Sequence, residues 1–252
     1  MASVQKFTEG AVRNQLRHNA REIADSSNHD IEPSLSKYNY TLTPDHNGLS
    51  DYDYYQQRKS ELYVWNRSDI KVLAGWVVTL PREITDPEQQ REFFRVTYDF
   101  LEARYGRENV VQATVHMDEG KREKVFDRWG QPVLNDDGSQ ATRVVYGQPH
   151  LHFCFIPVSS DSSSAHPQSE KICAKEVLNR HELQHFHSNL QSYLDAHGID
   201  CKVLNGAVKD FGRNRTVAEL KENYERDKEL ARLKEIERLY NSRERSQERG
   251  RW

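Results

Sequence analysis

Two short segments with an apolar residue at every second position constrain the fold of this chain more than any other feature. They are 109–116 (NVVQATVH) and 151–158 (LHFCFIPV). Successive side chains of a strand point to opposite faces of a sheet, so each segment predicts a strand with one apolar face. The expected apolar faces consist of Val111, Ala113 and Val115, and of Leu151, Phe153 and Phe155. The opposite faces consist of Gln112, Thr114 and His116, and of His150, His152 and Cys154.

Further segments add one strand and two helices to this expected sheet. Residues 72–80 (VLAGWVVTL) predict a central strand that ends before Pro81. A capping Asp86 and apolar residues at helical spacing predict a helix over Pro87–Tyr105, and a second amphipathic helix is expected over Arg180–His197. The predicted fold class is α/β (α+β): an antiparallel sheet of about five strands with these helices on one face.

Two domains are expected. The first covers residues 1–205 and includes residues 120–148 as an inserted hairpin, because NDDG at 135–138 is a strong turn signal. Residues 206–252 are highly charged and are expected to form a C-terminal helical extension.

Several local expectations concern the polar parts of the first domain. The sequence around His18 supports one or two helical turns, and 51–63 is expected to be helical. Alternating apolar residues predict a short strand at 38–42. The Ser-rich segment 159–169 is expected to be a loop.

Composition excludes several classes of protein. The 252 residues hold 36 Lys and Arg against 39 Asp and Glu, so a globally basic nucleic-acid protein is excluded, whereas a local basic surface is not. No apolar run is long enough to cross a membrane, and no secretory signal is visible. The 3 cysteines lack a CxxC spacing, which disfavours a disulfide scaffold and fits a reducing, cytoplasmic location.

The strongest chemical signal is the group formed by His116, His150 and His152. One residue separates the last two, so both imidazoles share one face of their strand. If 120–148 is a hairpin, its ends lie close together and His116 lies beside the pair. Three converging imidazoles form an open divalent-metal site that suits Mn, Zn, Ni, Co or Fe better than Mg. Such a metal can bind the non-bridging oxygens of a phosphodiester.

The motifs around these histidines resemble those of a known family. HMDE (116–119) followed by PHLH (149–152) is similar to the HUH motif of the Mob/Pre (MobV-type) plasmid mobilisation relaxases. Three further blocks resemble the same family in the same order, and the resemblance extends to about residue 230. These blocks are RHNAR (17–21), NHDIEPSLSKYNYTL (28–42) and RTVAELKE (215–222).

The resemblance implies a site- and strand-specific relaxase that nicks origin-of-transfer DNA by metal-dependent transesterification. It implies His18 as the nucleophile, which would form a covalent adduct with the 5′ phosphate, for mobilisation of a plasmid or an integrative element. It further implies His116, His150 and His152 as ligands of Mn²⁺ or Mg²⁺. Glu119 would orient or deprotonate His18 or help the metal site, and a bacterial cytoplasmic location follows.

Other residues and partners are carried over from the same blocks. Arg21 is expected to hold the scissile phosphate. The expected DNA contacts are Arg17, Asn19, Asn28, Asn39, Tyr40, Arg213 and Arg215. Asp30 is expected to cap a turn. The implied partners are origin-of-transfer DNA, with its single-stranded nick region and adjacent hairpin or duplex, and a type IV coupling protein.

The sequence departs from the family pattern in two places. Residues 120–148 separate the acidic residue from the PH pair, where the family has only a few residues. This insertion is expected either to extend the strands or to form an arm that grips DNA through Arg122, Lys124, Arg128 and Trp129. The chain also ends at Trp252, without the long coiled coil of many members. This fits either a relaxase domain of a longer protein or a short version.

Alternatives stay open at this stage. Other relaxases use a tyrosine nucleophile, and the tyrosines available are Tyr38, Tyr40, Tyr52, Tyr54 and Tyr55. A rolling-circle replication initiator or a transposase would share the histidine motif. A non-catalytic DNA-binding module would use the histidines for a structural metal. A metallohydrolase of small substrates would leave the RHNAR block without a role.

Overall fold

The computed structural model describes residues 2–23, 31–161 and 167–203, and residues 226, 229–230 and 232–234. Two compact units emerge from its contacts. One comprises residues 1–121 and 146–206, and the other comprises 122–145 and 207–252. Residues 122–145, in the middle of the inserted segment, are therefore grouped with residues 207–252. The boundaries expected from the sequence included them in the first domain, 1–205.

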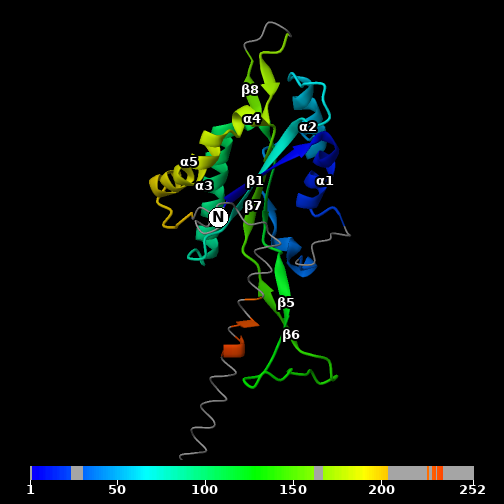
Figure 1. Cartoon of the computed structure of the whole chain (residues 1–252), viewed down its shortest axis with the longest axis vertical. Helices are drawn as coiled ribbons and strands as arrows, with labels where there is room; N and C mark the ends of the chain where they lie inside the picture. Colours follow the sequence, from blue (N-terminus) through cyan, green and yellow to red (C-terminus); the bar gives the residue numbers. More distant parts are fainter. Residues whose placement is uncertain are drawn as a thin grey trace, which may run out of the picture. The chain divides into compact units, whose positions relative to one another are not determined.

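A five-stranded sheet forms the centre of the first unit (Figure 1). The strands, in their spatial order, are β1 (Ala2–Thr8), β3 (Lys71–Thr79), β7 (His150–Phe155), β4 (Val110–His116) and β2 (Tyr40–Thr41). All neighbouring pairs are antiparallel. The predicted antiparallel sheet is thus confirmed, although β1 was not expected. β7 occupies the middle position, so its histidines lie at the centre of the sheet.

Two long helices cover one face of this sheet, as predicted. They are α3 (Pro87–Tyr105) and α5 (Arg180–Ala196). The Asp86 side chain caps α3 by accepting a hydrogen bond from the Gln89 amide at 2.9 Å. On the sheet side, Trp76 stacks on Phe186 with ring centroids 3.5 Å apart. Leu151, Phe153 and Phe155 belong to this core, so the predicted apolar face of β7 is correct.

The opposite face is also covered by helices, whereas the sequence predicted helical structure in both segments without placing it on this face. They are α1 (Glu9–Asn19) and α2 (Asp51–Ser60). Val12 and Leu16 are one turn apart on α1 and pack with Tyr55 of α2 against the sheet. Helix α1 is 11 residues long and so has three turns, whereas one or two were expected. Its two apolar anchors suffice because α2 shares the burial.

One predicted apolar face is wrong, because β4 contains a bulge. The pairing of β4 with β7 shifts in register between Val110 and Gln112. Val111 therefore packs in the α1–α2 core, whereas Ala113 and Val115 pack under α3 and α5. The alternation holds only from Gln112 onwards, because a bulge inserts one extra residue into a strand.

Shorter elements complete the description. They are the 3₁₀ helices η1 (Pro33–Tyr38) and η2 (Arg107–Asn109), the strand pairs β5 (Gly120–Lys124) with β6 (Thr142–Tyr146) and β8 (Val158–Ser160) with β9 (Glu170–Ile172), and α4 (Ala174–Val177). The strand predicted at 38–42 is thus shortened by η1, since Pro33 starts a helical turn. The ends of the Ser-rich segment pair as β8 and β9, and residues 162–166 lie outside the described part.

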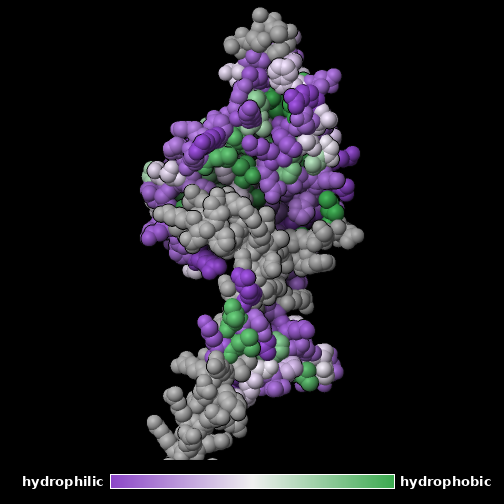
Figure 2. All heavy atoms as spheres, in the orientation of Figure 1, coloured by the Kyte–Doolittle hydropathy of each residue, from purple (hydrophilic) through white to green (hydrophobic). Residues whose placement is uncertain are grey.

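The inserted segment is a hairpin, as predicted. Gly138 has a φ of +79° and donates its amide to the Asn135 carbonyl at 3.0 Å, which closes the turn at NDDG. Phe126, Trp129 and Leu134 are exposed along this hairpin. Elsewhere the face shown in Figure 2 is mostly hydrophilic, in keeping with a mean hydropathy of −0.92. Within the described residues, no helix has the length and apolarity needed to span a membrane.

Candidate functional site

Three histidines converge on the sheet face that carries α1 and α2. His116 ends β4 and lies directly opposite His150 on β7. His152 lies two residues further along β7, on the same face. The ring centroids are 5.3 Å apart for His116–His150, 4.6 Å for His116–His152 and 4.9 Å for His150–His152. One nitrogen of each ring lies within 4.8 Å of the others, so the juxtaposition predicted from spacing is present.

Backbone carbonyls determine which nitrogen of two of these rings is free. His116 donates Nε2–H to the Asn19 carbonyl at 2.7 Å, and His150 donates Nδ1–H to the Gln148 carbonyl at 3.1 Å. A carbonyl oxygen only accepts, so in the neutral tautomers that make these bonds the lone pairs lie on His116 Nδ1 and His150 Nε2. His116 Nδ1 is buried and has no hydrogen-bond partner among the described residues. Such carbonyl partners are typical of metal-ligating histidines.

The electrostatics of the cluster favour neutral rings at His116 and His152. Burial lowers the pKa of His116 to about 3, with a further contribution from Arg21. Burial also lowers the pKa of His152 well below its usual value, and the neighbouring histidines add to this. Neutral imidazoles are the form that binds a metal. The donor set therefore fits a divalent metal of the Mn to Zn series.

His18 lies close to this cluster. It occupies the last turn of α1 and shares a cavity of about 180 Å³ with His152, Gly75 and Cys154. Burial lowers the pKa of His18, Arg21 lowers it further, and Glu119 opposes both. The structure thus brings the predicted nucleophile to the predicted metal ligands, although they lie far apart in the sequence.

Glu119 lies between two of the predicted site residues. Its Oε1 is 3.2 Å from Arg21 Nη2 and 3.7 Å from His150 Nε2. Its carboxylate also acts electrostatically on His18. The arrangement suits the predicted role of Glu119 in orienting a ring or accepting a proton near the cluster.

Arg21 has a place that the sequence did not anticipate. It donates Nε–H and Nη2–H to the two carboxylate oxygens of Asp118, at 3.0 and 2.7 Å. It also has a φ of +58°, in the left-handed region that favours glycine, at the position where α1 ends. Only Nη1 lacks a partner among the described residues. The bidentate contact of the guanidinium is made to Asp118, and Nη1 is itself buried, so the expected contact of Arg21 with the scissile phosphate stays a prediction.

Sequence reasoning missed Asp118, which is fully buried. Besides Arg21, it accepts hydrogen bonds from Ser36 Oγ at 2.8 Å and Asn39 Nδ2 at 2.7 Å. Burial would raise the pKa of Asp118, but Arg21, Ser36 and Asn39 hold it at about 2. The signal was present, because Asp118 lies between a predicted ligand and Glu119 in HMDE.

Two predicted DNA contacts are internal. Asn19 is buried, and its side chain donates to Cys154 Sγ at 3.3 Å and accepts from Gln15 at 2.9 Å. Asn39 donates to Asp118, and its Oδ1 accepts from the Met117 amide at 2.7 Å. The Asn19 side chain thus joins the end of α1 to β7, and the Asn39 side chain joins the residue before β2 to the residues that follow β4. DNA contacts by these two side chains stay a prediction.

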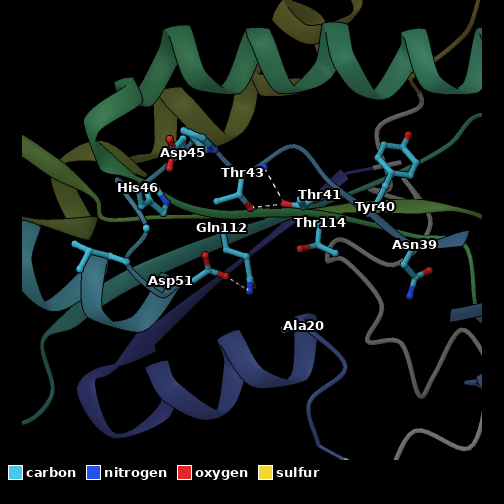
Figure 3. A pocket seen from close by; sticks show the side chains of 13 residues that line it. Ala20, Asn39, Tyr40, Thr41, Thr43, Asp45, His46, Asp51, Gln112 and Thr114 are labelled. Carbon is cyan, nitrogen blue, oxygen red and sulfur yellow. Dashed lines mark hydrogen bonds between the residues drawn. The ribbon is translucent and has the colours of Figure 1, made fainter. Parts of the chain in front are cut away.

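The other predicted DNA contacts differ in exposure. Arg17 is exposed and pairs with Glu22 at 3.6 Å. The Tyr40 ring points away from Gln112 (Figure 3), lies under Arg91 at 5.2 Å, and has its hydroxyl buried. Burial raises the pKa of Tyr40 to about 12. Predictions on Asn28, Asp30, Arg213 and Arg215 lie outside the described residues.

The tyrosines that could replace His18 as nucleophile lie elsewhere. None of the five lines the cavity shared by His18 and His152. The Tyr54 hydroxyl donates to the Glu108 carbonyl at 2.6 Å, and that of Tyr55 to Glu9 at 2.7 Å. The geometry therefore favours His18.

Comparisons with known proteins agree with the motifs. The Mob/Pre family model, described as plasmid recombination enzyme, matches residues 1–207. A plasmid recombination enzyme of Streptococcus agalactiae is 26% identical over 227 residues, which are 88% of this chain and 38% of that protein. One of Lactiplantibacillus plantarum is 26% identical over 209 residues, which are 81% of this chain and 48% of that protein. The chain thus spans less than half the length of these relatives.

Solved structures of a relaxase domain are also similar. The MobM relaxase domain bound to pMV158 oriT DNA, in a Mn-bound crystal at pH 6.8, is 27% identical with a TM-score of 0.64. That match covers 88% of this chain and 97% of the MobM chain. A Mn-bound crystal at pH 4.6 is 26% identical with a TM-score of 0.62, covering 88% and 98% of the two chains. This chain belongs to the Mob/Pre family of plasmid recombination enzymes.

Proposed function

We propose that this protein is a metal-dependent DNA relaxase that nicks one strand of an origin of transfer, for mobilisation of a plasmid or integrative element. The observation that carries the proposal is the cavity shared by His18 and His152, next to the cluster of His116, His150 and His152. Family membership and the similarity to a relaxase domain bound to oriT DNA support the same substrate.

His116, His150 and His152 would hold the metal. A divalent ion bound there, Mn²⁺ or Mg²⁺, would stabilise the charge on the scissile phosphate. The contribution of the chain is to fix the rings, since the carbonyls of Asn19 and Gln148 set the free nitrogens of His116 and His150. The imidazole set favours Mn²⁺ over Mg²⁺ as the resident ion.

His18 would act as the nucleophile. A neutral ring nitrogen attacks the phosphorus, an N–P bond forms, and the bond from phosphorus to the 3′ oxygen breaks. The other ring nitrogen gives up its proton towards Glu119, and the leaving 3′ oxygen takes one proton, so the charges balance. The product is a phosphoramidate that joins His18 to the 5′ end. The reverse attack by the 3′ hydroxyl rejoins the strand without a further energy source.

The matching experiment is a nicking assay on a supercoiled plasmid that carries a cognate origin, with Mn²⁺ or with EDTA. The variants are His18→Ala, His18→Tyr and, as a matched control, His185→Ala, an exposed histidine on α5. We expect Mn²⁺-dependent nicking and a protein–DNA adduct in the wild type and in His185→Ala, and neither in His18→Ala.

The acid sensitivity of the adduct separates the two possible nucleophiles. A phosphoramidate breaks down in acid, so the adduct should be lost on acid treatment. An acid-stable adduct that persists in His18→Ala would assign the attack to a tyrosine. DNA retention without nicking of any origin would instead indicate a binding module. The type IV coupling protein, the replication-initiator alternative and the cytoplasmic location stay predictions.

A further inference from the structure

A groove of about 530 Å³ runs along β4 on the face that carries the histidines (Figure 3). Strand β2, the segment 43–49, the start of α2 and Ala20 at the end of α1 bound it. Gln112 and Thr114 line it from β4, and Thr114 is paired with His152 across the sheet. The groove therefore begins beside the metal cluster and leads away from it. Its volume lies in the range of ligand sites, about 300–1,000 Å³.

The charge of the groove is unsuited to a phosphate backbone. Its described lining contains no Lys or Arg, but it includes the carboxylates of Asp45 and Asp51. Proteins hold DNA phosphates mainly with Lys and Arg, and a carboxylate repels them. The bases of a single strand carry no charge and offer hydrogen-bonding edges. The groove therefore suits bases rather than phosphates.

The polar groups at its floor are hydrogen-bond acceptors. Gln112 donates both Nε2 hydrogens, to the Leu16 carbonyl at 3.1 Å and to Asp51 Oδ2 at 2.6 Å. These two acceptors fix the orientation of the amide and leave Oε1, which has no partner among the described residues. Gln112 is only 2% exposed, so it is a rigid support for the half-buried Asp51. A ligand that supplies a hydrogen-bond donor therefore suits Asp51.

The walls of the groove are held in place before any ligand binds. Thr43 Oγ1 accepts from the Ala113 amide at 2.8 Å and thus fixes the segment beside β2. His46 donates Nε2–H to the Val111 carbonyl at 3.0 Å and stacks on Tyr54, with ring centroids 3.6 Å apart. A preformed site loses little entropy on binding, which favours selection between similar ligands.

We propose that this groove is a nucleobase subsite that selects a base with an exocyclic amino group and excludes the phosphate backbone. The proposal rests on the proposed function, because it assumes single-stranded DNA as the ligand. Cytosine, adenine and guanine carry an amino group and thymine does not, and Asp is a suitable acceptor for the amino group of cytosine. Asp51 is the selecting residue and Gln112 positions it.

The test compares oligodeoxycytidine with oligodeoxyuridine of equal length, because the two bases differ along one edge only. Cytosine has an amino group at C4 and an acceptor at N3, where uracil has a carbonyl and an N3–H donor. Binding is measured by fluorescence anisotropy in a His18→Ala background, so that cleavage does not interfere. We expect cytidine to bind about tenfold more tightly, the effect of one good base contact. Asp51→Asn keeps the size of the side chain but adds a donor, so the ratio should fall to one or reverse. Asp99→Asn on α3 should keep it.

The outcomes separate this inference from the proposed function. Equal binding of the two oligonucleotides, or a ratio unchanged in Asp51→Asn, overturns the subsite. Tighter binding of both oligonucleotides by Asp51→Asn, with a steeper salt dependence, overturns it in favour of a backbone channel. Thermal unfolding and Mn²⁺ binding of Asp51→Asn check that the fold is intact. A cytidine preference that depends on Asp51, in a protein that nicks no plasmid, supports the subsite and contradicts the relaxase.

Discussion

At the scale of single residues, the site depends on contacts that a short motif does not reveal. The triad itself was predictable, because His150 and His152 alternate with apolar residues on one strand. The carbonyl of Asn19, which orients His116, was not predictable, since backbone contacts between distant segments leave no residue-type signal. Asp118 was also missed, because the partners that give it a role, Arg21 and Asn39, come from other parts of the chain.

Replacing Asp118 with Asn should destabilise the protein strongly. The buried carboxylate pairs with Arg21, which is 13% exposed, and removing one partner of a buried ion pair costs about 3–5 kcal/mol. Chemical denaturation measures the loss in free energy of unfolding. Asp69→Asn is the control, because Asp69 pairs with Arg67 at the exposed surface and its replacement should change the free energy of unfolding far less. Equal effects of the two substitutions would contradict a structural role of Asp118.

At the scale of elements, periodicity predicted the helices and strands that have a regular apolar spacing, but not the features that depend on packing between segments. Helices α3 and α5 and strand β7 were predicted because their apolar residues repeat at a regular spacing. Strand β1 was missed because it lies at the sheet edge and buries only Ala2 fully. Helix α1 was predicted too short because only Val12 and Leu16 anchor it. The bulge at Val111 was missed because it depends on the pairing register of β4 with β7, which the composition of the strand does not reveal.

The contact between α3 and α5 should make stability depend on pH. Arg104 of α3 forms an ion pair with Glu182 of α5, which also accepts from the Tyr105 hydroxyl at 2.8 Å. Burial would raise the pKa of Glu182, but the bonds from Arg104 and Tyr105 prevail and lower it. A lowered pKa contributes stability above the unfolded value, about 4.3, and that stability is lost as the pH falls through the folded value.

Glu182→Gln removes this titration. Denaturation at a series of pH values should show a smaller loss of unfolding free energy below about pH 4.3 in the variant than in the wild type. Glu88→Gln, an exposed position at the start of α3, serves as the control and should keep the wild-type slope. Identical pH profiles for wild type and Glu182→Gln would rule out the contribution of this pair.

At the scale of the whole molecule, the chain consists of a sheet unit and a second unit that includes the inserted hairpin. Arg128 lies over the exposed Trp129 ring at 4.9 Å, and Arg232 lies over Phe126 at 4.0 Å within the second unit. Cations on aromatic rings suit contact with nucleic acid. The NDDG turn predicted the hairpin, but nothing in the sequence of the insertion indicated that it belongs to a unit separate from the sheet.

Replacing residues 125–141 with a two-residue Asn-Gly turn tests the independence of the units. The β5–β6 ladder would keep its ends, so the sheet unit should retain its thermal unfolding temperature and its Mn²⁺ affinity. Calorimetry measures both. Affinity for origin DNA should fall if the hairpin is the expected DNA-gripping arm. Loss of Mn²⁺ binding in a folded variant would show that the histidine cluster depends on the insertion.

The central claim is that His18 becomes covalently joined to the cleaved strand. The most direct measurement is mass spectrometry of the adduct, digested by protease and nuclease at neutral to mildly alkaline pH to preserve a phosphoramidate. We predict a nucleotide on the peptide that contains His18, and its loss after brief acid treatment. A nucleotide on a peptide that contains Tyr38, Tyr52 or another tyrosine, stable in acid, would contradict the account.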